Sequence, residues 1–154
     1  MSIEKNDEYF MSLALKEAQK AYKIGEVPIG AIVVKDNKVI SRGHNKRETS
    51  KSAISHAEVI AIEKACKKLG GWRLWQCDLY VTLEPCPMCT GAIINSRIKK
   101  VVYGAKDKKA GCFESVVNLI ELPFNHKPQV TCGVLQEECS NILKEFFREL
   151  RKNK

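Results

Sequence analysis

Cys89 lies three positions after Cys86, and the pair follows a short apolar run, Leu79–Leu83, that is typical of a buried strand. Pro87 comes directly after the first cysteine, and proline favours the first position of a helix because its missing N–H needs no partner there. We therefore expect Cys86 at the cap of a helix and Cys89 in its first turn, with both sulfurs on one face. A helix N-terminus lowers thiol pKa values and favours thiolates. The spacing predicts a metal site at this end of the strand.

A second group, His56-Ala57-Glu58, lies thirty residues before Cys86. One imidazole and two thiolates would give a zinc ion three ligands and leave its fourth tetrahedral position open to water. Glu58 stands in the first turn of the helix that His56 opens, so it can reach that water without binding the metal. It could take a proton from that water and so make hydroxide available for attack on a substrate. Two other interpretations stay open: a closed site with Glu58 as the fourth ligand, and a set of unrelated core residues.

The length and cysteine content indicate a single reduced domain. A chain of 154 residues is long enough to bury most of its apolar side chains, and we expect one domain, 1–154. No uncharged apolar run could span a bilayer, and the polar N-terminal segment is unlike a secretory signal. Seven cysteines, an odd number, suit cytoplasmic reduced thiols better than a disulfide framework. Four of them are expected to be small core residues: Cys66, Cys77, Cys132 and Cys139.

The net charge is +8, and basic residues gather at 99–100, at 106–109 and in the C-terminal tail. Such a surplus is compatible with a polyanionic partner such as nucleic acid. Lysine-rich solvated faces are also common in proteins that bind none. The charge by itself therefore leaves the partner open.

Apolar periodicity and turn residues predict that helices alternate with strands. We expect helices from the cap Asn6 to the stop at Gly25, from about His56 to Leu69 with Ser55 as cap, from Cys86 to about Ser96, over Ser115–Leu122 and over Gln136–Lys152. We expect strands at Gly30–Lys35, Val39–Gly43, Leu79–Leu83, Lys100–Gly104 and, at an edge, Val130–Val134. The polar stretch Asn45–Ser55 is expected to be an exposed loop.

This order of elements predicts an α/β sandwich with a mixed sheet, because a hairpin is followed by parallel β-α-β units. The helices that begin at His56 and Pro87 each follow a loop that leaves the sheet, where open α/β folds usually bind their ligands. The last helix carries an apolar stripe that indicates core packing: Ile142, Leu143, Phe146, Phe147 and Leu150.

The chain resembles bacterial tRNA adenosine deaminases of the TadA type, within the cytidine deaminase-like superfamily. The order of His-Ala-Glu and Pro-Cys-x-x-Cys is the signature of zinc deaminases. The similarity runs through strings along nearly the whole chain: Gly25–Ala31, Asn45, Ser55–Glu58, Leu79–Pro85, Ser96–Ile98, Val101–Ala105, Phe124–His126 and Phe146–Arg148.

The resemblance implies a three-layer α/β/α sandwich with a mixed five-stranded sheet, and a homodimer that converts adenosine to inosine at the wobble position of the tRNA anticodon. It implies one Zn²⁺ per subunit on His56, Cys86 and Cys89, with Glu58 as proton shuttle. Asn45 would hydrogen-bond the flipped base. The other residues implied to bind substrate are Val27, Pro28, Ile29 and Ala57 in the base pocket and Asp107, Asn125, His126, Phe147 and Arg148 at the flanking nucleotides.

Three departures from the family pattern bear on the substrate. The loop before His56 reads Ala53-Ile54-Ser55 and lacks a proline that the family usually has there, which should leave the approach to the helix less rigid. Pro87 makes the motif Cys-Pro-Met-Cys, which related guanine deaminases also carry. Phe113-Glu114 replace small residues near the presumed RNA surface.

Two alternatives to a tRNA deaminase therefore stay open. One is a free-base or nucleoside deaminase, such as a guanine deaminase, with the same metal chemistry. The other is a catalytically silent zinc module that only binds RNA or a protein partner, although such a module needs no unligated Glu58. Glu84, a second carboxylate near the site, is expected to hold a loop by hydrogen bonds.

Overall fold

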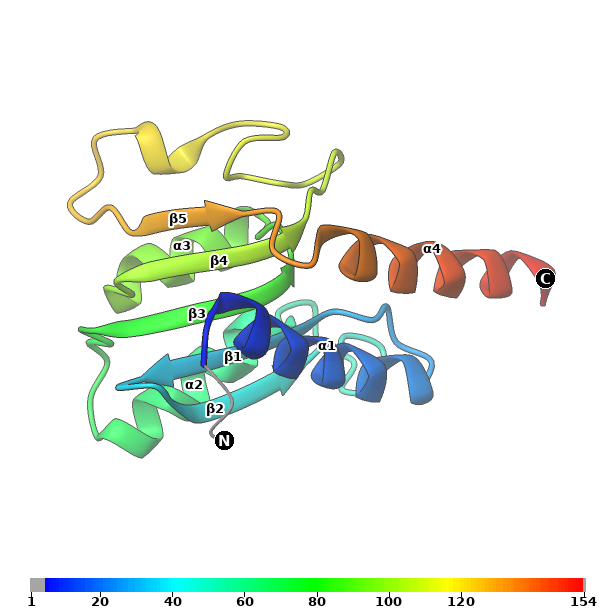
Figure 1. Cartoon of the computed structure of the whole chain (residues 1–154), viewed down its shortest axis with the longest axis horizontal. Coiled ribbons are helices and arrows are strands. Elements are labelled where there is room, and N and C mark those ends of the chain that lie inside the picture. Colours follow the sequence, from blue (N-terminus) through cyan, green and yellow to red (C-terminus); the bar gives the residue numbers. More distant parts are fainter. Residues whose placement is uncertain (1–4, 154) are drawn as a thin grey trace.

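One mixed sheet organises the chain in the computed structural model, which describes residues 5–153. Its strands lie in the order β2-β1-β3-β4-β5 (Figure 1). β1 is antiparallel to β2 and β3, whereas β3, β4 and β5 are parallel to one another. The strands are β1 (Gly30–Lys35), β2 (Lys38–His44), β3 (Cys77–Leu83), β4 (Lys100–Ala105) and β5 (Gln129–Cys132). The polar segment up to Glu4 and the last basic residue, Lys154, lie outside the described residues.

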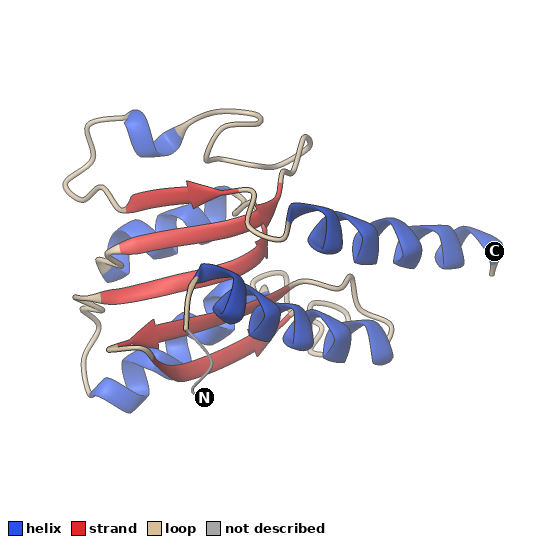
Figure 2. Cartoon of the chain, in the orientation of Figure 1, coloured by secondary structure: helices blue, strands red, loops and turns tan. Residues whose placement is uncertain are grey.

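Helices cover both faces of this sheet and make three layers. Figure 2 shows helices in front of the sheet and helices behind it. Those in front are α1 (Asp7–Lys23) and α4 (Gln136–Lys152), and those behind are α2 (Ala57–Leu69) and α3 (Pro87–Ser96). The predicted α/β/α sandwich with a mixed five-stranded sheet is confirmed.

The apolar character of β1 follows from its burial on both faces. Side chains alternate across a strand. Ala31 and Val33 pack into the core with α2, whereas Ile32 and Val34 pack into the core with α1. All four are buried, so the strand reads as a continuous apolar run rather than an alternating one.

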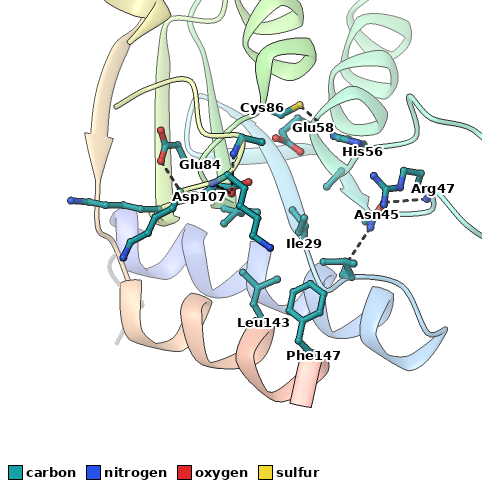
Figure 3. Close-up of a pocket in the computed structure, with 17 residues that line it drawn as sticks. Ile29, Asn45, Arg47, His56, Glu58, Glu84, Cys86, Asp107, Leu143 and Phe147 are labelled. Carbon is teal, nitrogen blue, oxygen red and sulfur yellow. Dashed lines mark hydrogen bonds between the residues drawn. The ribbon is translucent and has the colours of Figure 1, made fainter. Parts of the chain in front are cut away.

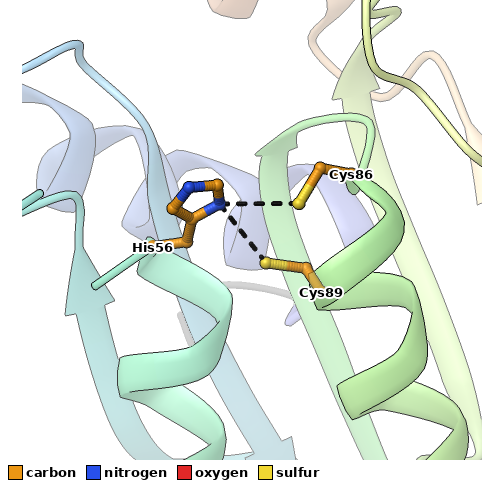
Figure 4. Close-up of side chains that lie close together, drawn as sticks. All are labelled: His56, Cys86 and Cys89. Atoms are coloured by element: carbon orange, nitrogen blue, oxygen red, sulfur yellow. Dashed lines mark hydrogen bonds between the residues drawn. The ribbon is translucent and has the colours of Figure 1, made fainter. Parts of the chain in front are cut away.

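The predicted starts of α1 and α3 are correct, whereas the predicted start of α2 is not. The side chain of Asn6 accepts a hydrogen bond from the Tyr9 amide and caps α1, and Pro87 opens α3. The predicted cap of α2 at Ser55 is wrong, because the N-cap is His56, whose side chain makes no capping bond. The imidazole is directed instead toward the two cysteines of the α3 start (Figure 4).

The helix predicted over Ser115–Leu122 is also wrong, since only a 3₁₀ turn at Leu119–Glu121 forms there. The amides of Phe113, Glu114 and Ser115 all donate to one carboxylate oxygen of Glu84 at 2.8–3.0 Å. Further along, the amides of Val116 and Leu119 donate to the carbonyls of Gly111 and Cys112 rather than to carbonyls four residues earlier, so the segment before the turn does not follow an α-helical path.

Two of the four cysteines predicted to be core residues are not buried, and its position on an edge strand explains the exposure of Cys132. Cys77 and Cys139 are fully buried as predicted, but Cys66 is only partly buried and Cys132 is exposed. Cys132 ends β5, the edge strand, and most of that strand's side chains are exposed. β5 stops at Cys132 rather than Val134 because Gly133 turns the chain at a φ of 80°.

The apolar stripe of α4 is buried along only part of its length. Phe146 is buried, whereas Phe147 and Leu150 are 41% and 48% exposed. Figure 1 shows the C-terminal half of α4 running past the end of the sheet. Among residues 5–153, no helix is both long and apolar enough to cross a membrane.

Candidate active site

His56, Cys86 and Cys89 meet at the carboxyl ends of β2 and β3 (Figure 4). His56 caps α2 and Cys86 caps α3, while Cys89 lies one turn further along α3. Their ligand atoms all lie within 4.8 Å of one another. The structure thus brings together the three side chains that the two sequence motifs predicted as a metal site.

The geometry of this cluster fits a zinc ion. Nδ1 of His56 is 3.5 Å from Sγ of Cys86 and 3.6 Å from Sγ of Cys89. Tetrahedral zinc with Zn–S bonds of about 2.3 Å and Zn–N bonds of about 2.0 Å requires N···S separations of about 3.5 Å. The donor set therefore matches zinc in type and in spacing.

The protonation of the cluster agrees with this fit. A hydrogen bond from Cys89, together with His56, lowers the pKa of the Cys86 thiol to about 4, and the same bond raises the pKa of Cys89. The hydrogen bond with Cys86 raises the pKa of His56. A zinc ion held by these donors would bind two thiolates and a neutral imidazole.

Glu58 lies in the first turn of α2 beside this cluster but is not part of it. Its side chain is only 4% exposed and lines a cavity of about 550 Å³ (Figure 3). Burial raises the pKa of Glu58 to about 7. A carboxyl group with such a pKa exchanges protons readily near neutral pH.

Asn45 is held rigidly in the same cavity rather than exposed on a loop, which corrects the prediction for this end of Asn45–Ser55. It is 6% exposed. Its Nδ2 donates to the carbonyl of Val27 at 3.2 Å, and its Oδ1 accepts from the amide of Arg47 at 3.1 Å. One Nδ2 proton and a carbonyl lone pair remain for a ligand in the cavity.

Five more of the residues that the resemblance assigns to the substrate also line the cavity. Val27, Ile29 and Ala57 form its apolar wall, and Asp107 and Phe147 lie on its rim. Asp107 also serves its own loop, because its Oδ1 accepts from the amides of Lys109 and Ala110.

Four predicted substrate contacts do not line this cavity: Pro28, Asn125, His126 and Arg148. Pro28 is buried next to the wall, and Asn125 and Arg148 are exposed elsewhere. His126 lies at the other end of the sheet, where its Nε2 is 2.7 Å from the carbonyl oxygen of Ile98. Its sequence position after a long loop gave no sign of that placement.

Sequence reasoning missed several residues of the cavity rim. Leu143 reaches it from α4 beside Phe147, and cationic side chains reach it from two loops (Figure 3). These cations are Arg47, Lys106, Lys108 and Lys109. The sequence showed that Lys106, Lys108 and Lys109 are clustered. That they line the same cavity as His56 depends on the path of the loop after β4.

Two buried carboxylates hold these loops. Glu84, 2% exposed, accepts from the amide of Asp107 at 3.1 Å and from the loop before the 3₁₀ turn at Leu119–Glu121, as predicted. Glu26, 1% exposed, accepts from the amides of Glu48 and Thr49 at 3.1 and 2.6 Å, which sequence reasoning missed. Burial alone would raise the pKa of each carboxyl, but the hydrogen bonds outweigh it and lower both pKa values.

Comparison with known proteins identifies the family. A family model described as MafB19-like deaminase matches residues 5–151. The chain belongs to the MafB19-like deaminase family. The tRNA-specific adenosine deaminase of Bacillus subtilis is 56% identical to it over 149 residues, which are 96% of this chain and 92% of that protein. The tRNA-specific adenosine deaminase of Aquifex aeolicus is 48% identical over 147 residues, 95% of this chain and 97% of that protein.

The solved structures that this MafB19-like deaminase resembles include tRNA deaminases and guanine deaminases. A structure from a study of A-to-I editing by tRNA:A34 deaminases at the wobble position matches with a TM-score of 0.85 and 46% identity, over 88% of this chain and 99% of that chain. A guanine deaminase from Bacillus subtilis matches with a TM-score of 0.63 and 35% identity, over 78% of this chain and 87% of that chain. The resemblance to tRNA adenosine deaminases is confirmed, and Pro87 does not make the guanine deaminase the better match.

Proposed function

We propose that this deaminase converts adenosine to inosine at the wobble position of a tRNA anticodon, with release of ammonia and with one zinc ion per subunit. The observation that carries the chemistry is Glu58, a buried carboxyl group that faces the cavity beside three metal-type donors without joining them. The 56% identity to the tRNA-specific adenosine deaminase of Bacillus subtilis supports the choice of substrate.

The roles in the reaction follow from where each side chain lies. His56, Cys86 and Cys89 would hold the ion, which supplies Lewis acidity that activates water at neutral pH. Glu58 takes a proton from the attacking water on a carboxylate oxygen and passes it to N1 of the purine. It then takes the second proton from the hydroxyl group added at C6 and gives it to the departing amine, which leaves as ammonia while the C6 carbonyl forms. Water adds and ammonia leaves, so adenosine becomes inosine with no other reactant.

Asn45 and the apolar wall would position the base. The Asn45 carboxamide is fixed on both sides by backbone bonds, so it presents its free donor and acceptor to the purine in one orientation. Val27, Ile29 and Ala57 would exclude water from around the ring.

The cations at the rim favour a polynucleotide over a free base. Arg47, Lys106, Lys108 and Lys109 surround the mouth of the cavity. Phosphates of the nucleotides on either side of the target would pair with such groups, whereas free guanine carries no phosphate. A silent RNA-binding zinc module would have no use for the buried Glu58. A tRNA substrate also accords with action in the cytoplasm.

An assay of substrates tests this proposal. Purified protein is incubated with an anticodon stem-loop bearing adenosine at the wobble position and, separately, with guanine, adenosine and cytidine. We expect inosine in the RNA, measured by nuclease digestion and mass spectrometry. A stem-loop with guanosine at the wobble position is the matched control. Ammonia released only from guanine would overturn the proposal.

A further inference from the structure

A second cavity, of about 500 Å³, lies at the opposite end of the sheet from Glu58. Gln76 directly precedes β3, Lys99 directly precedes β4, and Gln129 begins β5, so the cavity flanks the amino ends of these strands (Figure 1). β3 is seven residues long, so the two cavities lie roughly 20 Å apart. We call it the tryptophan cavity; its lining residues are Trp75, Gln76, Arg97, Lys99, His126, Lys127 and Gln129.

The lining is cationic and includes no acidic residue. Lys99 makes no ion pair within residues 5–153. Lys127 pairs with Glu121 at 3.1 Å, but both side chains are more than half exposed, and such a pair exchanges easily for another anion. Arg97 is partly committed, because its guanidinium donates to the carbonyl of Ile94 at 2.8 Å. Two lysines are therefore available to an anion at this cavity.

The indole of Trp75 is available beside these lysines. It is 54% exposed, and within residues 5–153 no aromatic ring or cation stacks on it. Trp72, 50% exposed, is already covered by the guanidinium of Arg73 at 4.1 Å from the ring centroid. An open indole next to lysine ammonium groups matches the way proteins hold single-stranded nucleic acid, with the base on the ring and the phosphate on the cations.

The backbone on both sides of the cavity is held in an uncommon conformation. Gln76 and Arg97 have φ values of 62° and 64°, in the left-handed region that side-chain-bearing residues seldom occupy. The Arg97 amide closes the end of α3, and Lys99 donates its amide to the carbonyl of Cys77 at 3.0 Å. The segments that carry Gln76 and Arg97 are thus fixed relative to each other before any ligand binds.

We propose that the tryptophan cavity binds one nucleotide of a single-stranded RNA segment, with the base on Trp75 and the 5′ phosphate between Lys99 and Lys127. The site is separate from the deamination site and does not depend on zinc. It would hold a part of an RNA that lies outside the nucleotide being modified.

Tryptophan fluorescence tests this site directly, because the chain has only two tryptophans, at positions 72 and 75. In Trp72→Phe, Trp75 is the sole indole reporter. We expect pentauridylate, which offers no adenine to deaminate, to quench its emission to saturation. Uridine monophosphate should compete at the same site, and uridine without phosphate should not. Tenfold tighter binding of the pentamer than of the monophosphate identifies an RNA strand as the ligand, whereas equal binding identifies a free nucleotide.

Charge reversal distinguishes specific binding at the tryptophan cavity from the non-specific attraction of RNA to a basic protein. We expect Lys99→Glu/Lys127→Glu to weaken binding of the pentamer at least tenfold. The matched control, Lys16→Glu/Lys23→Glu on α1, makes the same change in net charge at exposed lysines and should have less than a twofold effect. Absence of quenching in Trp72→Phe, or equal weakening by both double variants, overturns the proposal. The stem-loop deamination assay is independent of either result.

Discussion

At the scale of single residues, the cluster separates metal binding from proton transfer. His56, Cys86 and Cys89 lie close enough to share one ion, while Glu58 faces the cavity from two positions beyond His56, in the first turn of α2. A carboxylate that bound the ion would close the coordination sphere and leave no room for water. The roles of Glu58 and of the cysteines should therefore be separable by mutation.

We expect Glu58→Ala to keep the zinc content of the wild type but to lower kcat on the stem-loop by a factor of about 100 to 10,000, the usual contribution of a general acid–base group. Cys89→Ala, the matched control, should lose both zinc and activity. Zinc per chain is measured by inductively coupled plasma mass spectrometry and activity by release of ammonia. Loss of zinc from Glu58→Ala would show that Glu58 is a ligand and contradict the mechanism.

At the scale of elements, loops on either side of the cavity depend on carboxylates that lie under them. Glu84 receives four backbone amides and the Ser115 hydroxyl. In Glu84→Gln one oxygen becomes an NH₂ group that faces donors. We expect a loss of about 1.5–3 kcal/mol in the free energy of unfolding at pH 7, because hydrogen bonds to a charged group are lost.

The pH dependence of this loss has a definite sign. The pKa of Glu84 is lowered in the folded protein from an ordinary value of 4.5. Its stabilisation is therefore fully present above the unfolded pKa and is lost as the pH falls through the folded pKa. Urea unfolding of wild type and Glu84→Gln should give a constant difference from about pH 6 to 7 and a smaller one below pH 4.5. A difference that grows toward low pH would contradict this account.

The approach of α1 to the sheet depends on Gly30 at the start of β1. A Cβ atom at this position would overlap the carbonyl oxygen of Ala14 and the amide nitrogen of Ala18. We expect Gly30→Ala to lower the free energy of unfolding by about 1–3 kcal/mol, since backbone atoms cannot move aside as a flexible side chain would. Gly71→Ala, where a Cβ would meet open space, is the matched control and should be nearly neutral. Equal losses in the free energy of unfolding of the two variants would show that α1 packs less closely against β1 than the structure indicates.

At the scale of the whole molecule, the charge of +8 matters through its arrangement. If Arg47, Lys106, Lys108 and Lys109 each contact a phosphate, the logarithm of the binding constant for the stem-loop should fall with the logarithm of salt concentration at a slope of about −3. Lys106→Gln/Lys108→Gln should make that slope shallower by about 1.4, whereas Lys16→Gln/Lys23→Gln should hardly change it. Fluorescence anisotropy measures both. A flat salt response would exclude a large phosphate footprint.

The proposed homodimer has a candidate surface on the loop between β4 and β5. Its exposed apolar side chains are Val116, Val117, Leu122 and Phe124. Apolar groups gathered in one exposed loop are typical of an interface. We expect sedimentation at the mass of a dimer, and dissociation to monomers in Val117→Asp but not in Ile24→Asp, an equally exposed position on the last turn after α1. Sedimentation of the wild type as a monomer would contradict the dimer.

The elements that sequence reasoning recovered are those with local signals. The strands around Val33 and Val81 were recognisable from short apolar runs, and α3 from Pro87 at its start. The segment over Ser115–Leu122 looked helical because its residues allow a helix. The Ser115 amide instead donates to Glu84, thirty-one residues earlier in the chain, and the Leu119 amide donates to the carbonyl of Cys112. No local pattern records such partners.

The sequence by itself determined the donor set and the carboxyl group beside it, because each lies in a short motif at a helix start whose local geometry follows from residue type. Only the tertiary structure decided what surrounds them. It brought Phe147 and Leu143 of α4 to the rim of the cavity and carried His126 to the far end of the sheet. The physical reason is that these placements depend on how distant segments cross the sheet, and the packing that sets those crossings involves residues far apart in the chain.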